Sequence, residues 1–389
     1  MKSKKYIGRM LFTVIIGTFL IIGTLDNLNI LNKPIERLLS ATIDFPQFIT
    51  EVKDSYVLNF NDKERFINLN GLFARVTGQH VYNEVSVLNN GMLDYECLEQ
   101  LDMSEFASGI KTFETQLTEE KINFTYVQVP CKSDLSDTLL GEGSVNYGNK
   151  NATELIGLLK TQKTKVLDLR TSITATVSDV ESYFYHTDHH WNTKGAFVAY
   201  GGVLEYLKQQ FPDKKIDLSL ANCENWEQTI YKDWFLGSHG KRVGIYFGGV
   251  DDLTIYTPKF ETRMSMYVPK HHAHYSGSFE DTVIKSEYLD TPDYFHENPY
   301  CAYIGGDYPL VYHKNDLAEN DLKVLMIKDS FSLPMQSFLS TAIRELEVLD
   351  PRYYNETTVA EYVMKSNPDI VLMMVNPSMF ENESYYRLS

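Results

Sequence analysis

The stretch YHTDHHWNTKGAF, from Tyr185 to Phe197, contains three of the chain's ten histidines, one carboxylate and one of its three tryptophans. Imidazole and carboxylate side chains this close together can bind a metal ion, or they can act as a general base and the group that orients it. The stretch by itself fits both kinds of site. Its chemistry therefore depends on which partner residue lies elsewhere in the chain.

A candidate nucleophile lies in LKVLMIKDSFSLPMQSFL, the segment from Leu322 to Leu339. Ser330 follows an apolar run that predicts a buried strand and precedes a helical pattern, so we expect it at a strand-to-helix turn. In an open parallel sheet, ligands bind beyond the carboxyl ends of the strands, and a helix N-terminus there points N–H groups at a developing oxyanion. The alternative is that Ser330 or Asp329 simply caps the helix.

A nucleophilic serine needs a base, and the base needs a group that orients it. The TDHHW motif supplies both. If this segment is extended, Asp188 and His190 project to the same face, because strand side chains alternate. The carboxylate would then hold one imidazole nitrogen while the other faces Ser330. His189 would point the opposite way and serve in packing.

A metal site is the competing interpretation. His186, Asp188 and His190 could ligate as alternate residues, and the HHAH segment from His271 to His274 could add further ligands. The sequence has no H-E-x-x-H motif beside them, and KHHAH falls in a β-rich region where we expect a solvated loop. We therefore predict no metal ion and no cofactor.

Strand and helix patterns alternate around these residues. Helical periodicity from about Met103 to Lys121 is followed by the strand INFTYVQVP, the helix NATELIGLLK with Asn151 as its N-cap, and the strand KVLDL. A long helix, TKGAFVAYGGVLEYLKQQF, begins near Thr193. The rhythm resumes near the C-terminus as LKVLMI, SFSLPMQSFLSTAI, LEVLD, TVAEYVMKS and PDIVLMMV. This alternation predicts a parallel α/β sheet flanked by helices.

Residues about 214–320 have a different character. The segment KRVGIYFGGVDDLTIYTPKFETRMSMYV carries β-branched and aromatic runs that are separated by GG and DD. Such runs are typical of hairpins, so we predict a β-rich insertion into the α/β unit.

The N-terminus has the pattern of an export signal. Four basic residues among the first nine precede an uncharged run from Met10 to Leu25, and no small-residue cleavage site of the A-x-A kind follows. Including Tyr6 to Gly8, the segment reaches about twenty residues, enough to span a bilayer. We predict a transmembrane anchor at residues 1–29, a membrane-proximal linker at 30–60 and an extracytoplasmic catalytic domain at 61–389. A cleaved signal peptide is the alternative.

Composition restricts the class of partner. The chain has 52 acidic and 36 basic side chains and a net charge of −16, so its surface repels polyanions and nucleic acid is excluded as a partner. Its hydrophobic content of 43% is that of a globular protein. The four cysteines are widely spaced and include no C-x-x-C pair, so the spacing predicts no particular disulfide.

The motif TDHHWNTKGA, followed far downstream by IKDSFS, resembles the DHHW family, which is related to the SGNH-hydrolase-like domains of the alginate O-acetyltransferases. In that group the Asp-x-His-Trp block precedes the serine, as it does here. LNNGMLDY, VPCK, IGGDYPL and LDPRYYN resemble further family segments, so the resemblance extends over roughly residues 55–380. It implies an SGNH-hydrolase-like fold.

Carried over to this sequence, the resemblance implies that Ser330 is the nucleophile, His190 the base and Asp188 the group that orients the base. It also makes Gly306 and Arg352 candidates for lining the oxyanion and acceptor pocket, although a turn glycine and an ion-paired arginine are equally ordinary roles. The serine block departs from the family pattern at Lys328, where glycine is common. Ser332 is the fallback nucleophile.

Two classes of function fit these observations. The first is a membrane-anchored extracytoplasmic O-acetyltransferase or acetylesterase that acts on a cell-envelope or exopolysaccharide glycan, and the resemblance implies a multi-spanning membrane acyltransferase as the supplier of acetyl groups. The second is a non-catalytic glycan-binding protein, for which 26 tyrosines and 21 phenylalanines would be ample. A pure binding protein has no need of a serine, a histidine and an aspartate together, so we favour the enzyme.

The N-terminal anchor generates the first testable prediction. The full-length protein should partition with membranes, because an apolar segment of about twenty residues is stable in a bilayer. External protease should digest the rest of the chain. Membrane fractionation with N-terminal sequencing measures both, and recovery of a soluble form that starts near residue 26 would contradict the anchor.

Overall fold

The computed structural model describes residues 27–59, 62–95, 97, 99–132, 138–141, 144–170 and 182–388. The apolar run from Met10 to Leu25, in which we predicted the membrane anchor, lies outside these residues. Among the described helices, none is both long enough and apolar enough to cross a bilayer. The chain divides into two compact units, residues 1–69 and 70–389.

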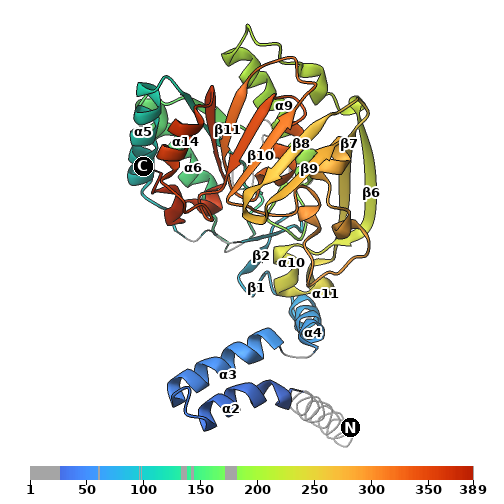
Figure 1. Ribbon diagram of the computed structural model, residues 1–389. Coiled ribbons are helices and arrows are strands. Elements are labelled where there is room, and N and C mark those ends of the chain that lie inside the picture. The colour runs from blue at the N-terminus through green and yellow to red at the C-terminus, as the bar shows by residue number, and fades with distance from the viewer. Residues whose placement is uncertain are drawn as a thin grey trace, which may run out of the picture. The chain divides into compact units, whose positions relative to one another are not determined.

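The first unit contains two described helices, α2 (Asn32–Leu39) and α3 (Phe45–Asn59), which lie side by side (Figure 1). An ion pair between Arg37 and Glu51 joins them. Residues 30–60, which we predicted as a membrane-proximal linker, therefore contain two helices. The sequence of this segment has little helical periodicity, so it did not indicate them. A third helix, α4 (Lys63–Val76), begins near the end of this unit.

The second unit is built on one eight-stranded sheet with the strand order β5-β4-β13-β11-β12-β10-β8-β9. The first five strands are parallel, whereas β10, β8 and β9 each run antiparallel to the strand before them in this order. The sheet is therefore mixed, and the prediction of a parallel sheet holds for five strands only. The bounds of the strands, in sheet order, are Val166–Asp168, Asn123–Gln128, Ile370–Val375, Lys323–Ile327, Glu345–Leu349, Leu310–Asn315, Met264–Val268 and Ala273–Gly277.

Helices cover both faces of the parallel part of the sheet. On β11, Val324 and Met326 pack into one hydrophobic core, while Leu325 and Ile327 pack into the other, as expected for alternating strand side chains. One core includes α9 (Thr193–Gln210) and α13 (Ser332–Leu339). The other includes α5, α6 and α14, which lie together on one side of the sheet (Figure 1). These three helices span Ser104–Glu119, Gly148–Thr161 and Val359–Ser366.

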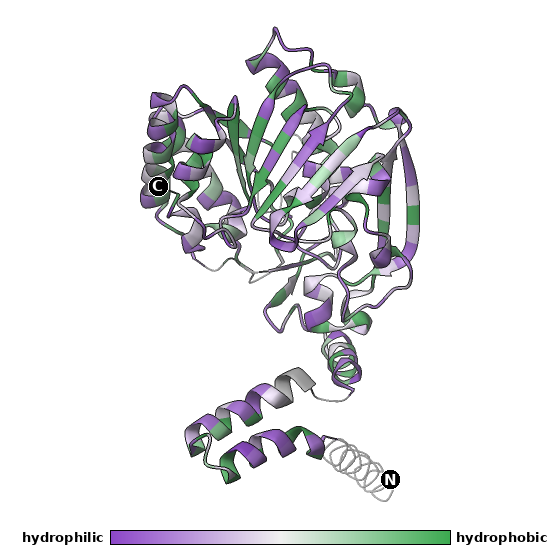
Figure 2. Cartoon of the chain, viewed as in Figure 1, coloured by the Kyte–Doolittle hydropathy of each residue, from purple (hydrophilic) through white to green (hydrophobic). Residues whose placement is uncertain are grey.

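This burial on both sides explains the hydropathy of the elements. In Figure 2 the central strand β11 is almost entirely green, whereas α5 shows both green and purple segments. A strand that is covered on both faces needs apolar residues at every position, and a helix that covers it needs only one apolar face. The strand that we predicted from the apolar run LKVLMI is therefore observed, as β11.

The region that we predicted as a β-rich insertion, about 214–320, is divided between two sheets. Only β6 (Trp226–Phe235) and β7 (Asp251–Pro258) form a separate antiparallel pair, while β8, β9 and β10 extend the main sheet. The sequence showed hairpins but not their partners, because pairing depends on contacts that a local pattern does not contain. The short helices α10 (Ser238–Val243), α11 (Ile245–Gly248) and α12 (Phe279–Val283) complete the region.

The remaining predicted elements are close to those observed. A small sheet precedes them, formed by β1, β2 and β3, which span Val81–Tyr82, Val85–Val87 and Leu93–Tyr95.

Asn151 differs from its predicted position, because we expected it to cap α6 and it lies inside that helix. Its side-chain oxygen accepts from the backbone N–H of Leu101, and its amide donates to the carbonyl of Glu99. This asparagine therefore anchors the preceding loop.

A buried ion-pair cluster joins the loops that follow β11 and β12. Because Ile327 pairs with Leu349 in parallel register, the next residues, Lys328 and Asp350, meet at the same edge of the sheet. The Lys328 ammonium group lies 3.2 Å from Asp350 and also pairs with Asp307, and its side chain is only 1% exposed. Arg352 bonds both carboxylates. Two cations therefore neutralise two anions in this cluster, and Lys328 precedes the candidate serine by two residues.

Substitution of Lys328 tests how much this cluster stabilises the folded protein. Lys328→Ala leaves only the positive charge of Arg352 against the two buried carboxylates of this cluster, so we expect it to lower the free energy of unfolding by about 3–5 kcal/mol. The matched control is Lys232→Ala, because Lys232 forms an exposed pair with Asp252 and should unfold at nearly the wild-type urea concentration. Equal urea midpoints for the two variants would contradict a stabilising role for the cluster.

Candidate active site

Ser330 lies in the turn between β11 and α13, at the carboxyl end of the parallel strands, as we predicted. Asp329 shapes this turn: one carboxylate oxygen accepts from the backbone N–H of Phe331 at 3.0 Å, and the other accepts from that of Asn376 at 2.6 Å. The pKa of Asp329 is raised by burial. No side chain caps α13, so the alternative role of Ser330 as a helix cap is not observed.

The segment that carries Asp188 and His190 is a tight loop, not the extended strand that we expected. Phe184 and Trp191 form an isolated β-bridge, and residues 186–190 bend between them. The first residue of β7, Asp251, holds this loop. Its carboxylate accepts from the backbone N–H groups of His186 and Thr187, at 2.6 and 2.8 Å, and from the Thr187 hydroxyl at 2.6 Å.

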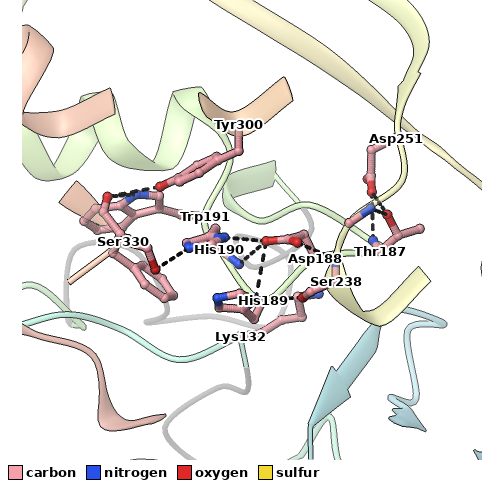
Figure 3. Close-up of polar contacts among 12 residues, drawn as sticks. Lys132, Thr187, Asp188, His189, His190, Trp191, Ser238, Asp251, Tyr300 and Ser330 are labelled. Carbon is pink, nitrogen blue, oxygen red and sulfur yellow. Dashed lines mark hydrogen bonds and ion pairs between the residues drawn. The ribbon is translucent and has the colours of Figure 1, made fainter. Parts of the chain in front are cut away.

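The loop places three side chains in one continuous hydrogen-bond chain (Figure 3). His190 Nε2 lies 2.7 Å from Ser330 Oγ, and His190 Nδ1 lies 2.5 Å from Asp188 Oδ1. The same carboxylate oxygen accepts from the His190 backbone N–H at 2.9 Å. A short turn, in which Asp188 reaches forward two residues, thus achieves the pairing that we had expected from strand alternation. That the three residues are catalytic stays a prediction.

The carboxylate of Asp188 is buried and fully engaged. Burial by itself would raise its pKa, but the adjacent His189 and His190 rings and the hydrogen bonds from His190 and Ser238 hold the pKa well below its usual value. The Ser238 backbone N–H donates to Asp188 Oδ2 at 2.6 Å. Asp188 is therefore ionised at neutral pH, which favours the tautomer in which His190 Nδ1 carries the proton and Nε2 can accept one from Ser330.

Aromatic side chains fix the plane of the His190 ring. Tyr300 stacks on it with a centroid distance of 4.1 Å and an interplanar angle of 18°, and the His189 ring lies on it at 3.8 Å. Trp191 Nε1 and the Tyr300 hydroxyl both donate to the carbonyl of Phe331, at 2.8 and 3.1 Å. The tryptophan of the motif therefore joins the histidine loop to the residue that follows Ser330.

The other predicted site residues have mixed outcomes. Arg352 uses its guanidinium group on Asp350 and Asp307, which gives it a structural role, and Gly306 adopts a φ of +135°, a conformation that favours glycine. Their predicted roles at an oxyanion or acceptor pocket stay predictions. The hydroxyl of Ser332, the fallback nucleophile, is fully buried.

The metal interpretation also changes in detail. Among the described residues, ligand atoms of Asp188, His189 and His190 lie within 4.8 Å of one another, and His186 is not part of this group. Both oxygens of Asp188 and both ring nitrogens of His190 already make hydrogen bonds. A metal ion here would have to displace the bond between His190 and Asp188. His271, His272 and His274 are exposed, as we expected, but His274 lies on strand β9 and not in a loop.

Comparison with known proteins identifies a related family for part of the chain. Residues 92–222 match the family model described as the SGNH hydrolase-like domain of the acetyltransferase AlgX. The match covers about a third of the chain and includes Asp188 and His190, while Ser330 lies beyond it. The predicted resemblance is confirmed. No curated protein sequence matches the chain.

Solved structures share the fold of the second unit. Bacillus cereus PatB1, solved with a sulfonyl adduct, is 20% identical, with a TM-score of 0.64 over 77% of this chain and 98% of that one. A DHHW family protein from Eubacterium siraeum DSM 15702 is 18% identical, with a TM-score of 0.59 over 78% of this chain and 95% of that one. At these identities the similarity shows a common fold, and it extends beyond the residues that the family model matches.

Sequence reasoning missed several residues that build the site. Tyr300, Asp251 and the pair Gly237–Ser238 lie more than 40 residues from the DHHW motif in the chain, and we assigned none of them a role at the site. Gly237 is closest to the carboxylate: a Cβ atom there would lie 2.2 Å from the Asp188 Cβ and 2.6 Å from Oδ2. Only glycine fits, although its φ of −75° would suit any residue.

Gly237→Ala tests whether this close approach positions Asp188. The new methyl group should push the carboxylate away from His190, so we expect kcat/KM for a chromogenic acetyl ester to fall by about 10²-fold. It should also lower the free energy of unfolding by about 1–3 kcal/mol. The matched control is Gly157→Ala, on an exposed part of α6 where a Cβ would meet no atom within 4 Å. A folded Gly237→Ala protein with the activity of the control would contradict this role.

Proposed function

We propose that the chain is a membrane-anchored, extracytoplasmic O-acetyltransferase, or an acetylesterase, that acts on a cell-envelope or exopolysaccharide glycan through Ser330, His190 and Asp188. The observation that carries the proposal is the continuous hydrogen-bond chain from Ser330 through His190 to Asp188 at the carboxyl ends of the parallel strands. The match to the AlgX acetyltransferase domain supports the choice of reaction.

The geometry is suited to a two-step acyl transfer. In the first step Ser330 Oγ attacks the carbonyl carbon of an acyl ester while His190 Nε2 takes the hydroxyl proton, and that proton then passes to the departing alcohol. In the second step an acceptor hydroxyl attacks the acyl-serine ester, His190 takes its proton, and Ser330 recovers a proton as its bond to the acyl carbon breaks. A sugar acceptor makes the protein a transferase, and water makes it an esterase.

The residues around His190 suit this cycle. Asp188 does not need to accept the proton, because an ionised carboxylate 2.5 Å from Nδ1 stabilises the imidazolium that forms. Stacking on Tyr300 keeps the ring aligned while the charge appears and disappears. The acyl donor that we expect, a multi-spanning membrane acyltransferase, would require the anchor at residues 1–29 to keep the site near the membrane.

Two other functions remain in competition. A metal-dependent hydrolase would use the cluster of Asp188, His189 and His190, so its activity should fall when a chelator is added. A glycan-binding protein without catalysis would bind oligosaccharide but hydrolyse no ester. The hydrogen bond between His190 and Ser330 favours the serine enzyme over both, because neither alternative needs it.

Substitution of the three residues tests the proposal. Ser330→Ala and His190→Ala should each lower kcat/KM for a chromogenic acetyl ester by about 10³-fold or more, and the double variant should be scarcely worse, because triad members act as one unit. Asp188→Ala should cost somewhat less. PatB1 was solved with a sulfonyl adduct, so we use a sulfonyl fluoride as the probe and expect mass spectrometry to find it on Ser330.

The controls separate the competing functions. Ser332→Ala should remain active and be labelled at Ser330, and a chelator should leave ester hydrolysis unchanged. An active Ser330→Ala protein, or a label on Ser332, would contradict the nucleophile assignment. Stoichiometric zinc together with chelator-sensitive activity would favour the metal-dependent hydrolase.

A further inference from the structure

The sequence predicted that His189 would point away from Asp188 and His190 and serve in packing, but the structure places its ring beside that of His190. Its ring lies 3.8 Å from the His190 ring, yet 31% of its side chain is exposed, whereas the His190 side chain is 6% exposed. It lines a pocket of about 410 Å³. One imidazole of the motif is therefore enclosed among its partners, and the neighbouring one is partly exposed in the wall of this pocket.

The His189 ring is held in place by one nitrogen only. Nδ1 lies 2.8 Å from the Ser238 hydroxyl, and the same Ser238 donates its backbone N–H to Asp188 (Figure 3). Among the contacts of the described residues, His189 Nε2 makes no hydrogen bond. Burial lowers the pKa of His189 to about 3, so the ring is neutral at physiological pH. A neutral imidazole can donate or accept at its open nitrogen, as a sugar hydroxyl can.

The pocket has the size and chemistry of a binding site for a small organic group. Most of its exposed wall is apolar and includes Tyr95, Leu101 and Met379, and polar side chains such as Asp94 and Glu381 line it together with His189. A pocket of a few hundred Å³ with an apolar wall and few polar groups is typical of ligand sites. An acetyl group would fill only a small part of it, whereas a sugar ring offers both an apolar face for the wall and hydroxyls for His189.

The pocket also lies at the correct edge of the sheet. Cys131 and Lys132 follow the end of β4, and Asn376 and Pro377 follow the end of the neighbouring strand β13. Ligands of open α/β sheets bind beyond these carboxyl ends. The Lys132 ammonium group donates to the carbonyls of Leu93, at 2.5 Å, and His186, at 3.2 Å, so it braces the pocket wall against the histidine loop.

We infer that this pocket is the acceptor subsite and that His189 holds a hydroxyl of the acceptor sugar beside the catalytic base. The inference rests on the proposed function and adds the place where the acceptor binds. It differs from the expectation drawn from the family resemblance, because neither Gly306 nor Arg352 lines this pocket.

The inference gives the two histidines separate tasks. His190 Nε2 takes the proton of the attacking hydroxyl as the oxygen bonds to the acyl carbon, and Ser330 recovers a proton when its own bond to that carbon breaks. His189 transfers no proton. It keeps the sugar, in preference to water, next to the acyl-serine, so it determines the ratio of transfer to hydrolysis.

The test compares His189→Ala with the wild-type full-length protein in two assays: hydrolysis of a chromogenic acetyl ester, and acetyl transfer from that ester to a panel of envelope oligosaccharides, read by mass spectrometry. Transfer should fall about tenfold more than hydrolysis, through a higher KM for the acceptor, because one hydrogen bond to the sugar is lost. His189→Gln should recover part of the loss. The control is His274→Ala, an exposed histidine on β9 that should change neither reaction.

A second variant changes another residue that lines the pocket and does not alter the histidines. Met379→Trp should fill the pocket and lower transfer relative to hydrolysis, as His189→Ala does. Equal losses in both assays for His189→Ala would overturn the inference, because His189 would then act only through His190. An unchanged acceptor KM in both variants would also overturn it while the proposed function stood. Activity in Ser330→Ala would instead overturn the proposed function.

Discussion

The site depends on one buried carboxylate. The Asp188 side chain is 4% exposed, and a carboxylate removed from water is costly unless hydrogen bonds replace the water that it has lost. Three N–H groups do so here, from the His190 backbone, the His190 ring and the Ser238 backbone. These donors come from two segments about fifty residues apart, so the histidine loop and the start of α10 can take their places only together. Glycine at position 237 leaves room for the Asp188 side chain, and the hydrogen bond from Thr187 to Asp251 holds the histidine loop in place. Both features serve to bring the two segments together around the carboxylate.

A second set of buried charges fixes the serine side of the site. Lys328 occupies a position where glycine is common in the resembling family, and a lysine there would be costly if it were alone. The structure pairs it with Asp307 and Asp350, and Arg352 bonds the same two carboxylates. The resemblance suggested the segments GGDYP and LDPRYY as sources of pocket residues. In the structure they supply Asp307 and Asp350, whose negative charges offset the cost of burying the Lys328 ammonium group. The departure from the family pattern and the two segments are parts of one arrangement.

Much of the fold could be predicted from the sequence because the strands are covered on both faces. Runs such as LKVLMI and PDIVLMMV predict buried strands directly, and the need of a nucleophilic serine for a base predicted that Ser330 would meet His190. The partners of β8, β9 and β10 could not be predicted, because a hairpin pattern does not say which sheet edge it joins. Tyr300, Asp251 and Gly237 could not be predicted either, since each acts through contacts that arise only in the tertiary structure. The pairing of Asp188 with His190 was predicted for a wrong reason: strand alternation was assumed, and a tight turn produces it.

That turn also explains why the motif contains two adjacent histidines. In an extended strand His189 and His190 would lie on opposite faces, and only one could serve the site. In the bent loop their rings lie 3.8 Å apart, so they share one edge of the sheet but have different surroundings. His190 has a partner on each ring nitrogen and is shielded by Tyr300, which suits a base that must deliver one proton along one path. His189 has one nitrogen anchored and borders the pocket. A loop that bends to satisfy a buried carboxylate therefore places a second imidazole in the wall of the pocket that we propose as the acceptor subsite.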